Sequence, residues 1–167
     1  MAIEIERRFL VSSPCDAIDA AVGSPIYIVQ GYFGCIDRLR VRVRMCWDAH
    51  DDCRACLTFK GARRGYCRLE YEYPLAPERA KRALDALPAM QIICKKRYTV
   101  PHTSGLEWSV DQFEGANSGL FIGEVELTHA RQEFELPAWV GEEITFNRMY
   151  GNSRLARSPV RPLMAVA

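Results

Sequence analysis

One stretch of the chain alternates charged and apolar residues without a break. Over residues 37 to 47 the two kinds stand at alternate positions, Arg38, Arg40, Arg42 and Arg44 against Leu39, Val41, Val43 and Met45. A period of two is the repeat of a β-strand, because successive side chains point to opposite faces of a sheet. The segment is therefore predicted to be a strand with one basic face and one apolar face.

The same alternation recurs in other parts of the chain. Near the N-terminus Glu4, Glu6 and Arg8 share a face opposite Ile5 and Phe9. Two later segments follow the same pattern, residues 66–75 with Arg68, Glu70 and Glu72 against Leu69, Tyr71 and Tyr73, and residues 120–128 with Glu124 and Glu126 on one face. Several such strands with few helices between them predict a mainly β (α+β) protein built on an antiparallel sheet or barrel.

The remaining helices and strands are predicted from residues that cap or interrupt regular structure. We expect strands over 26–33, 57–60, 91–100 and 106–113, and helices after Ser12-Ser13-Pro14, over 77–87, around 130–136 and over 153–157. Five aromatic residues are predicted to lie in the core (Trp108, Trp139, Tyr71, Tyr73 and Tyr98), and Arg38 at the rim or surface. The chain is predicted to be a single domain over residues 1–157, followed by a loose tail over 158–167.

Composition excludes several classes of function. A net charge of +1 over 167 residues gives no general attraction to nucleic acid or membranes, so neither is expected as a partner. The chain has no apolar run that could span a bilayer and no secretory signal, so we expect a cytoplasmic protein. Seven cysteines at irregular spacing favour reduced thiols, and Cys53 and Cys56 are interpreted as incidental rather than as metal ligands.

The position of the charged faces has two interpretations. An antiparallel sheet with one solvated face would explain any single strand. An unbroken arginine row is costly on such a face, because adjacent like charges repel. If the sheet closes into a barrel, the charged faces line a wet lumen and the apolar faces pack under helices such as residues 77–87. Basic strands would then hold a polyanion, and glutamate strands a divalent metal bridging to it.

The ordered set of motifs resembles the CYTH domain family, the triphosphate tunnel metalloenzymes, from Glu4 to about Ala156. The opening Glu-Ile-Glu-Arg-Arg is similar to the family signature of two alternate glutamates and a lysine. Further motifs agree along the chain, namely Gln30-Gly31-Tyr32, the Arg-x-Arg strand ending at Arg44, Leu57 to Lys60, Arg68 to Glu72, Lys95 to Tyr98, Asp111, Glu124 to Glu126, Gly141 to Thr145 and Tyr150 to Ala156. Two positions depart from the family, because Arg8 replaces the signature lysine and Asn147 replaces an aspartate.

The resemblance implies a closed eight-stranded antiparallel barrel with a charged tunnel and a few flanking helices. It implies a cofactor, Mg²⁺ or Mn²⁺, and a small-molecule triphosphate as substrate, for a chain that is a monomer or homodimer. We expect an inorganic triphosphatase that converts tripolyphosphate to diphosphate and phosphate by in-line attack of a metal-associated water on the terminal phosphorus. The alternatives are a class IV adenylyl cyclase, a thiamine or nucleoside triphosphatase, and a non-catalytic module that binds polyphosphate or a phosphorylated metabolite.

The resemblance also assigns roles to individual residues. The expected metal ligands are carboxylates, Glu4, Glu6, Glu124, Glu126 and Asp111. The expected phosphate-binding residues are cations, Arg40, Arg42, Arg44, Lys60, Arg68, Lys95 and Arg97. The expected catalytic residues are Arg8, Lys60, Glu70 and Glu72. For Glu70, Glu72 and Asp111 two interpretations stay open, in which they bind a second metal or hold neighbouring arginines in place.

Overall fold

The structure is a computed structural model, and it describes residues 2–36, 39–102 and 105–160. Two expectations, the position of Arg38 and most of the loose tail, lie outside the described residues. The strands are β1 (Ala2–Val11), β2 (Val22–Ile36), β3 (Leu39–Trp47), β4 (Cys53–Lys60), β5 (Cys67–Leu75), β6 (Ile92–Pro101), β7 (Glu107–Phe113), β8 (Phe121–Glu126) and β9 (Val140–Glu143). The helices are α1 (Pro14–Asp19), α2 (Pro77–Asp85) and α3 (Asn152–Arg157), with short 3₁₀ turns η1 (Ala89–Gln91), η2 (Gly115–Asn117) and η3 (Arg148–Tyr150).

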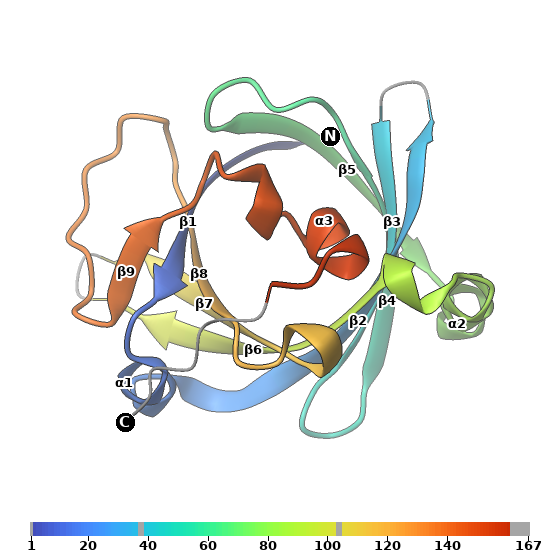
Figure 1. Cartoon of the computed structure of the whole chain (residues 1–167), viewed down its shortest axis with the longest axis horizontal. Helices are drawn as coiled ribbons and strands as arrows, with labels where there is room; N and C mark the ends of the chain where they lie inside the picture. The colour runs from blue at the N-terminus through green and yellow to red at the C-terminus, as the bar shows by residue number, and fades with distance from the viewer. Residues whose placement is uncertain (1, 37–38, 103–104, 161–167) are drawn as a thin grey trace.

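Eight antiparallel strands close into a barrel, as predicted. The sheet runs in the order β5-β4-β3-β2-β6-β7-β8-β1, and a further pairing between β1 and β5 closes the ring (Figure 1). Strand β1 makes this closure because residues 2–5 pair with β5 along one edge, while residues 6–10 pair with β8 along the other. The short strand β9 adds to the far end of β1. The charged N-terminal strand therefore sits at the seam of the barrel.

The apolar faces of the strands point outward, and helices and loops cover much of them. Val43 and Met45 of β3 pack against Ala80 and Leu84 of α2. On another side of the barrel, Trp108 of β7 lies in a second cluster with residues of β1, β8, α1 and the segment around Trp139. Helices α1 and α2 lie outside the ring of strands (Figure 1). This arrangement confirms that the apolar faces pack under helices and leaves the charged faces inside.

Helix α3 lies inside the ring of strands and fills one part of the lumen (Figure 1). Its residues Leu155 and Ala156 pack against inward-facing apolar residues such as Ile93, Phe113 and Ile122. These residues belong to the same strand faces as the charged side chains, because Ile93 precedes Lys95 and Ile122 precedes Glu124 by two positions. The inner surface of the barrel therefore changes from apolar, under α3, to charged.

The prediction of a helix over residues 130–136 is wrong. After a short turn the segment is irregular, and Gln132 accepts hydrogen bonds from the backbone N–H and the hydroxyl of Thr128. Phe134 packs edge-on against Trp108 at a centroid distance of 5.9 Å, so tertiary packing outweighs the local helix preference. Helix α2 also ends at Asp85, two residues before the predicted boundary.

Two aromatic residues assigned to the core are exposed instead. Tyr71 and Tyr73 of β5 retain 47% and 55% of their accessible surface. They lie on the outward face of the barrel, as the alternation requires, but on that face of β5 it is Leu75, at the end of the strand, that packs against the α2 cluster. Trp108 and Trp139 are buried as predicted.

None of the helices in the described parts of the chain is long and apolar enough to cross a membrane.

We expect Leu155→Ala to destabilise the protein by about 2–5 kcal/mol, because the Leu155 side chain is fully buried and its removal leaves a cavity inside the barrel. Urea denaturation followed by circular dichroism measures the change. The control is Met149→Ala in the adjoining segment, whose side chain is exposed and whose truncation should change stability by less than about 0.5 kcal/mol. Equal stability of the two variants would contradict the assignment of α3 as a packed plug.

Candidate active site

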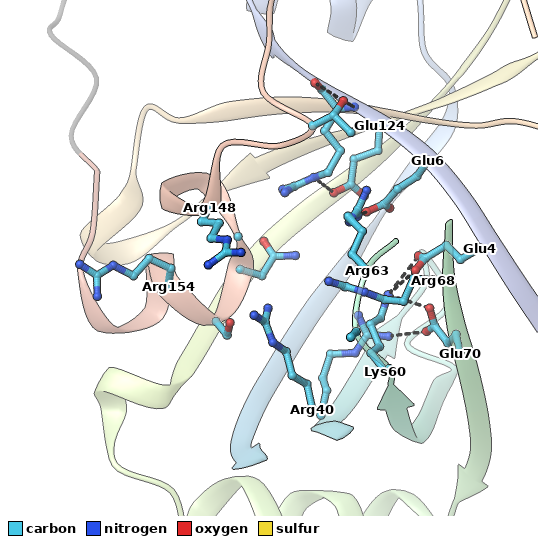
Figure 2. Close-up of a pocket in the computed structure, with 18 of the residues that line it drawn as sticks. Glu4, Glu6, Arg40, Lys60, Arg63, Arg68, Glu70, Glu124, Arg148 and Arg154 are labelled. Carbon is cyan, nitrogen blue, oxygen red and sulfur yellow. Dashed lines mark hydrogen bonds and ion pairs between the residues drawn. The ribbon is translucent and has the colours of Figure 1, made fainter. Parts of the chain in front are cut away.

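The charged part of the lumen is a cavity of about 1220 Å³. Inward-facing residues of the barrel strands and residues 145–157 line it together, and Figure 2 shows labelled side chains from both groups converging. Most of the predicted site residues lie in this lining, namely Glu4, Glu6, Arg8, Arg40, Arg42, Arg44, Lys60, Arg68, Glu70, Glu72, Arg97, Glu124 and Glu126. Lys95 and Asp111 lie outside the lining, and both are fully buried.

A buried network of ion pairs forms the base of the site. Asp111 forms an ion pair with Lys95 and accepts from Arg97 Nε at 2.7 Å. Arg97 also donates through Nη2 to Glu124 at 2.6 Å, and Arg8 Nε donates to the other Glu124 oxygen at 2.9 Å. Burial alone would raise the pKa of Glu124, but Arg97 and Arg8 beside it hold that pKa well below its usual range. Glu124 is therefore a carboxylate held between two guanidinium groups.

The geometry of Asp111 supports one of its two predicted roles. Burial alone would raise its pKa, but Arg97 and Lys95 lower the pKa of this carboxyl instead. Both neighbours occupy its oxygens, and the residue does not line the cavity. This arrangement favours Asp111 as the counter-ion that holds Arg97 in place over Asp111 as a metal ligand. Lys95 likewise lies beneath the cavity surface, where it neutralises Asp111.

Glu70 and Glu72 hold cations on the neighbouring strands. Arg42 Nη2 donates to Thr58 at 3.0 Å and to Glu72 at 3.1 Å, and lies 3.4 Å from a Glu70 oxygen. Lys60 bridges Glu70, at 2.7 Å, and Glu4, at 3.0 Å. Through these contacts the two glutamates orient Arg42 and Lys60.

Four glutamates form an acidic cluster in the lining, Glu4, Glu6, Glu124 and Glu126. Glu6 and Glu126 lie directly across from each other on β1 and β8. Burial raises the pKa of Glu6, and the nearby charges of Glu124 and Glu4 raise it further. Burial, Glu4 and Glu6 raise the pKa of Glu126 in the same way. The carboxylates are therefore close enough to repel one another, and a cation among them would relieve that repulsion.

The acidic cluster suits a hard divalent cation. Carboxylate oxygens are the ligands that Mg²⁺ and Mn²⁺ prefer. Within residues 2–36, 39–102 and 105–160, no three His, Cys, Asp or Glu side chains converge tightly enough to hold an ion unaided. Mg²⁺ is usually bound through one or two carboxylates together with substrate phosphates and water, so this donor set fits a site that the substrate completes.

Four arginines form a basic cluster in the lining, Arg40, Arg42, Arg44 and Arg68. Among the described residues, only Arg42 of this cluster forms an ion pair with a carboxylate. Burial lowers the pKa of Arg44, and Arg42 and Arg97 lower it further. Burial, Arg63 and Arg40 lower the pKa of Arg68. In addition, Arg42 Nε and Arg68 Nε are buried without a hydrogen-bond partner. The cluster therefore has donors and positive charge to offer an anion.

Sequence reasoning missed four cavity arginines that do not lie on strands. Arg63 comes from the loop between β4 and β5, and Arg148, Arg154 and Arg157 come from the C-terminal segment. Strand alternation carries no information about loops, so no pattern marked these residues. Asn147 also lines the cavity, where its side chain accepts a hydrogen bond from the Met149 backbone at 3.1 Å and caps η3.

We expect Asp111→Asn to cost about 3–5 kcal/mol of stability in metal-free buffer, because it leaves Lys95 buried without its counter-ion. Burial already lowers the pKa of Lys95 to about 8, despite the opposing effect of Asp111. Without Asp111 the pKa of Lys95 falls further, so just below pH 8 the folded variant has already lost a proton that folded wild type still holds. The stability deficit should therefore shrink as the pH rises from about 6 to 8 and stay constant above it.

Thermal unfolding across this pH range, with EDTA present, measures the effect. Asp85→Asn is the control, because it removes an exposed carboxylate that pairs with Lys81 on the surface and should cost about 0–1 kcal/mol. A metal-free Asp111→Asn protein as stable as wild type would exclude the counter-ion role.

Known proteins match this chain over nearly its whole length. The model of the CYTH domain matches residues 2–158. The inorganic triphosphatase of Acetivibrio thermocellus is 37% identical over 161 residues, which cover 96% of this chain and 97% of that protein. The inorganic triphosphatase of Nitrosomonas europaea is 32% identical over 158 residues, which cover 93% and 97%.

Solved structures agree with the fold. The crystal structure of the inorganic triphosphatase NE1496 superposes with a TM-score of 0.65 at 28% identity and covers 97% of this chain and 99% of that one. The PH1819 protein from Pyrococcus horikoshii shares the fold at a TM-score of 0.53 and 20% identity, over 77% and 80% of the two chains. Because the family model spans almost every residue and two full-length relatives match it, the chain belongs to the CYTH domain family.

Proposed function

We propose that the protein is a divalent-metal-dependent inorganic triphosphatase, which hydrolyses tripolyphosphate to diphosphate and phosphate. The observation that carries the proposal is the cavity in which an acidic cluster and a largely unneutralised basic cluster face the same space. A triphosphate has about four to five negative charges near neutral pH, which matches a site of several arginines and a metal. The two curated relatives are both named inorganic triphosphatases, which supports the same substrate.

The positions and contacts of the site residues suggest a different role for each. Arg42 and Arg44 lie two positions apart on β3 and would bind phosphate oxygens through paired N–H donors. Lys60 supplies a compact charge that Glu4 and Glu70 already hold in the cavity. Arg97 is fixed by Asp111 and Glu124, so it would meet the substrate without first having to be ordered.

The acidic cluster would hold Mg²⁺ or Mn²⁺, which supplies charge neutralisation at the phosphate oxygens and a more acidic water for hydrolysis. Ionised Glu124, together with Glu4 and Glu6, would orient that water in line with the terminal phosphorus. Positive charge from the basic cluster would stabilise the leaving diphosphate. We place the protein in the cytoplasm, where reducing conditions suit the free cysteines of the described residues.

Phosphate release from tripolyphosphate, ATP and thiamine triphosphate, each with Mg²⁺ or Mn²⁺, tests the proposed substrate. We expect turnover to be fastest with tripolyphosphate and to stop when EDTA is added. Cyclic AMP formed from ATP would instead identify a class IV adenylyl cyclase. Tight binding of tripolyphosphate without release of phosphate would identify a binding module.

We expect Arg44→Ala to raise the KM for tripolyphosphate by about 10- to 100-fold, the range that corresponds to a lost hydrogen bond to a charged group of about 1.5–3 kcal/mol. Steady-state kinetics at saturating Mn²⁺ measures the change. The matched control is Arg79→Ala on the outside of the barrel, in the exposed part of α2, which should leave KM unchanged. An unaltered KM for Arg44→Ala would remove Arg44 from the phosphate-binding set.

A further inference from the structure

The loop between β4 and β5 carries two adjacent arginines that point in different directions. The backbone of Arg64 pairs with that of Cys67 through hydrogen bonds of 2.9 and 3.1 Å, and Gly65 has a φ of +60° that favours glycine. This tight turn leaves Arg64 exposed to solvent. Arg63, immediately before it, lines the cavity, and only 18% of its side chain is exposed. The two residues form a natural pair for comparison.

Arg63 neutralises a carboxylate of the acidic cluster. Its Nη2 atom lies 2.5 Å from an oxygen of Glu6, in an ion pair that joins the loop to β1 (Figure 2). Glu6 also lies within the electrostatic influence of Glu124 and Glu4. Arg8 and Lys60 offset this repulsion in part, and among the described residues Arg63 is the cation that contacts Glu6 directly. A divalent metal at Glu6 would have to displace this guanidinium.

The same guanidinium is only partly satisfied where it stands. Arg63 Nη1 is buried and has no hydrogen-bond partner. Arg63 is also close enough to Arg68 to lower the pKa of that residue, together with Arg40, after the larger effect of burial. A phosphate near the basic cluster would accept from the unpaired nitrogen and would relieve the repulsion among these arginines.

A second contact fixes the loop over the cavity. Tyr66 packs against Phe146 of the C-terminal segment, with ring centroids 4.9 Å apart and ring planes at 50°. Phe146 lines the cavity as well. After Arg63 the loop is attached by its own turn to β5 and by this aromatic contact, and before Arg63 the Gly61 N–H donates to the Leu69 carbonyl at 2.9 Å. The Arg63 side chain can therefore change partner while the backbone stays in place.

We propose that Arg63 is an exchangeable counter-ion, a phosphate-binding residue that neutralises Glu6 when the site is empty and turns to the substrate phosphate when a divalent metal occupies Glu6. The proposal rests on the proposed function for the identity of the anion. It has a thermodynamic consequence. Before substrate binds, Arg63 and the metal compete for Glu6, whereas with substrate present Arg63 contributes to the affinity, so metal and triphosphate bind with positive coupling.

Binding of Mn²⁺ alone tests the competition without any enzymatic turnover. Mn²⁺ is titrated into phosphate-free wild-type protein, Arg63→Ala and Arg64→Ala, and free Mn²⁺ is measured by electron paramagnetic resonance. We expect Arg63→Ala to bind Mn²⁺ about 5- to 10-fold more tightly than wild type, within the usual range of coupling between sites. Arg64→Ala removes the same charge from the same loop and should change the affinity by less than 2-fold. Equal or weaker Mn²⁺ binding by Arg63→Ala would overturn the proposal, whether or not the protein hydrolyses tripolyphosphate.

The second half of the proposal is tested with tripolyphosphate. At saturating Mn²⁺, Arg63→Ala should raise the KM by about 10-fold, and Arg63→Lys should restore part of the loss because it keeps the charge without the fork of donors. A KM equal to that of wild type in Arg63→Ala would overturn the exchange of partners. Arg63→Gln, which keeps polar hydrogen-bonding groups on a shorter side chain but removes the charge, is measured in parallel and should follow Arg63→Ala in both assays. Unfolding curves confirm that every variant is folded under assay conditions.

Discussion

Neutralisation of buried charge is the constraint on which the interior of this barrel depends. Asp111 is held by Lys95 and Arg97, and Arg97 reaches on to Glu124, which Arg8 contacts from the other side. A buried ion that loses its partner costs several kcal/mol, so each residue in this series of ion pairs requires the next. The same contacts join β1, β6, β7 and β8 through side chains as well as through the backbone ladder. The charge network is therefore part of the fold as well as of the site.

The network neutralises the acidic residues more completely than the basic ones. Arg40, Arg44 and Arg68 form no ion pair within the described parts of the chain, while Lys60, Arg8 and Arg97 each contact a carboxylate. The helix α3 closes the apolar part of the lumen, so the excess of positive charge remains in the open part. Such a site is organised for an anion before the anion arrives, and an anion that binds only the folded state would also stabilise the fold.

The alternation of residue types predicted the strands and the separation of their charged and apolar faces. That the charged faces point inward is one of two interpretations of this pattern, and the closed barrel is implied by the family resemblance. The alternation did not predict which inward-facing side chains reach the cavity surface and which stay buried beneath it. Asp111 and Lys95 have the same parity as residues that reach the cavity, yet both lie beneath its surface. The alternation also gave no information on Arg63, because the two-residue repeat of a strand does not extend into a loop. Nor did it predict how far helices cover the outer face of the barrel, as exposed Tyr71 shows. The features that the sequence pattern did not predict are thus those that depend on tertiary packing.

The replacement of the family lysine by Arg8 has a consequence that follows from the shape of the side chain. Arg8 Nε donates to Glu124, and Nη2 donates at 3.0 Å to the backbone carbonyl of Tyr150. One guanidinium thus connects β1 to β8 and to the C-terminal segment that ends in α3. Lysine has a single ammonium group at the end of a flexible stem, whereas arginine directs several donors from one rigid plane. In this chain the position therefore joins the acidic cluster to the plug of the barrel.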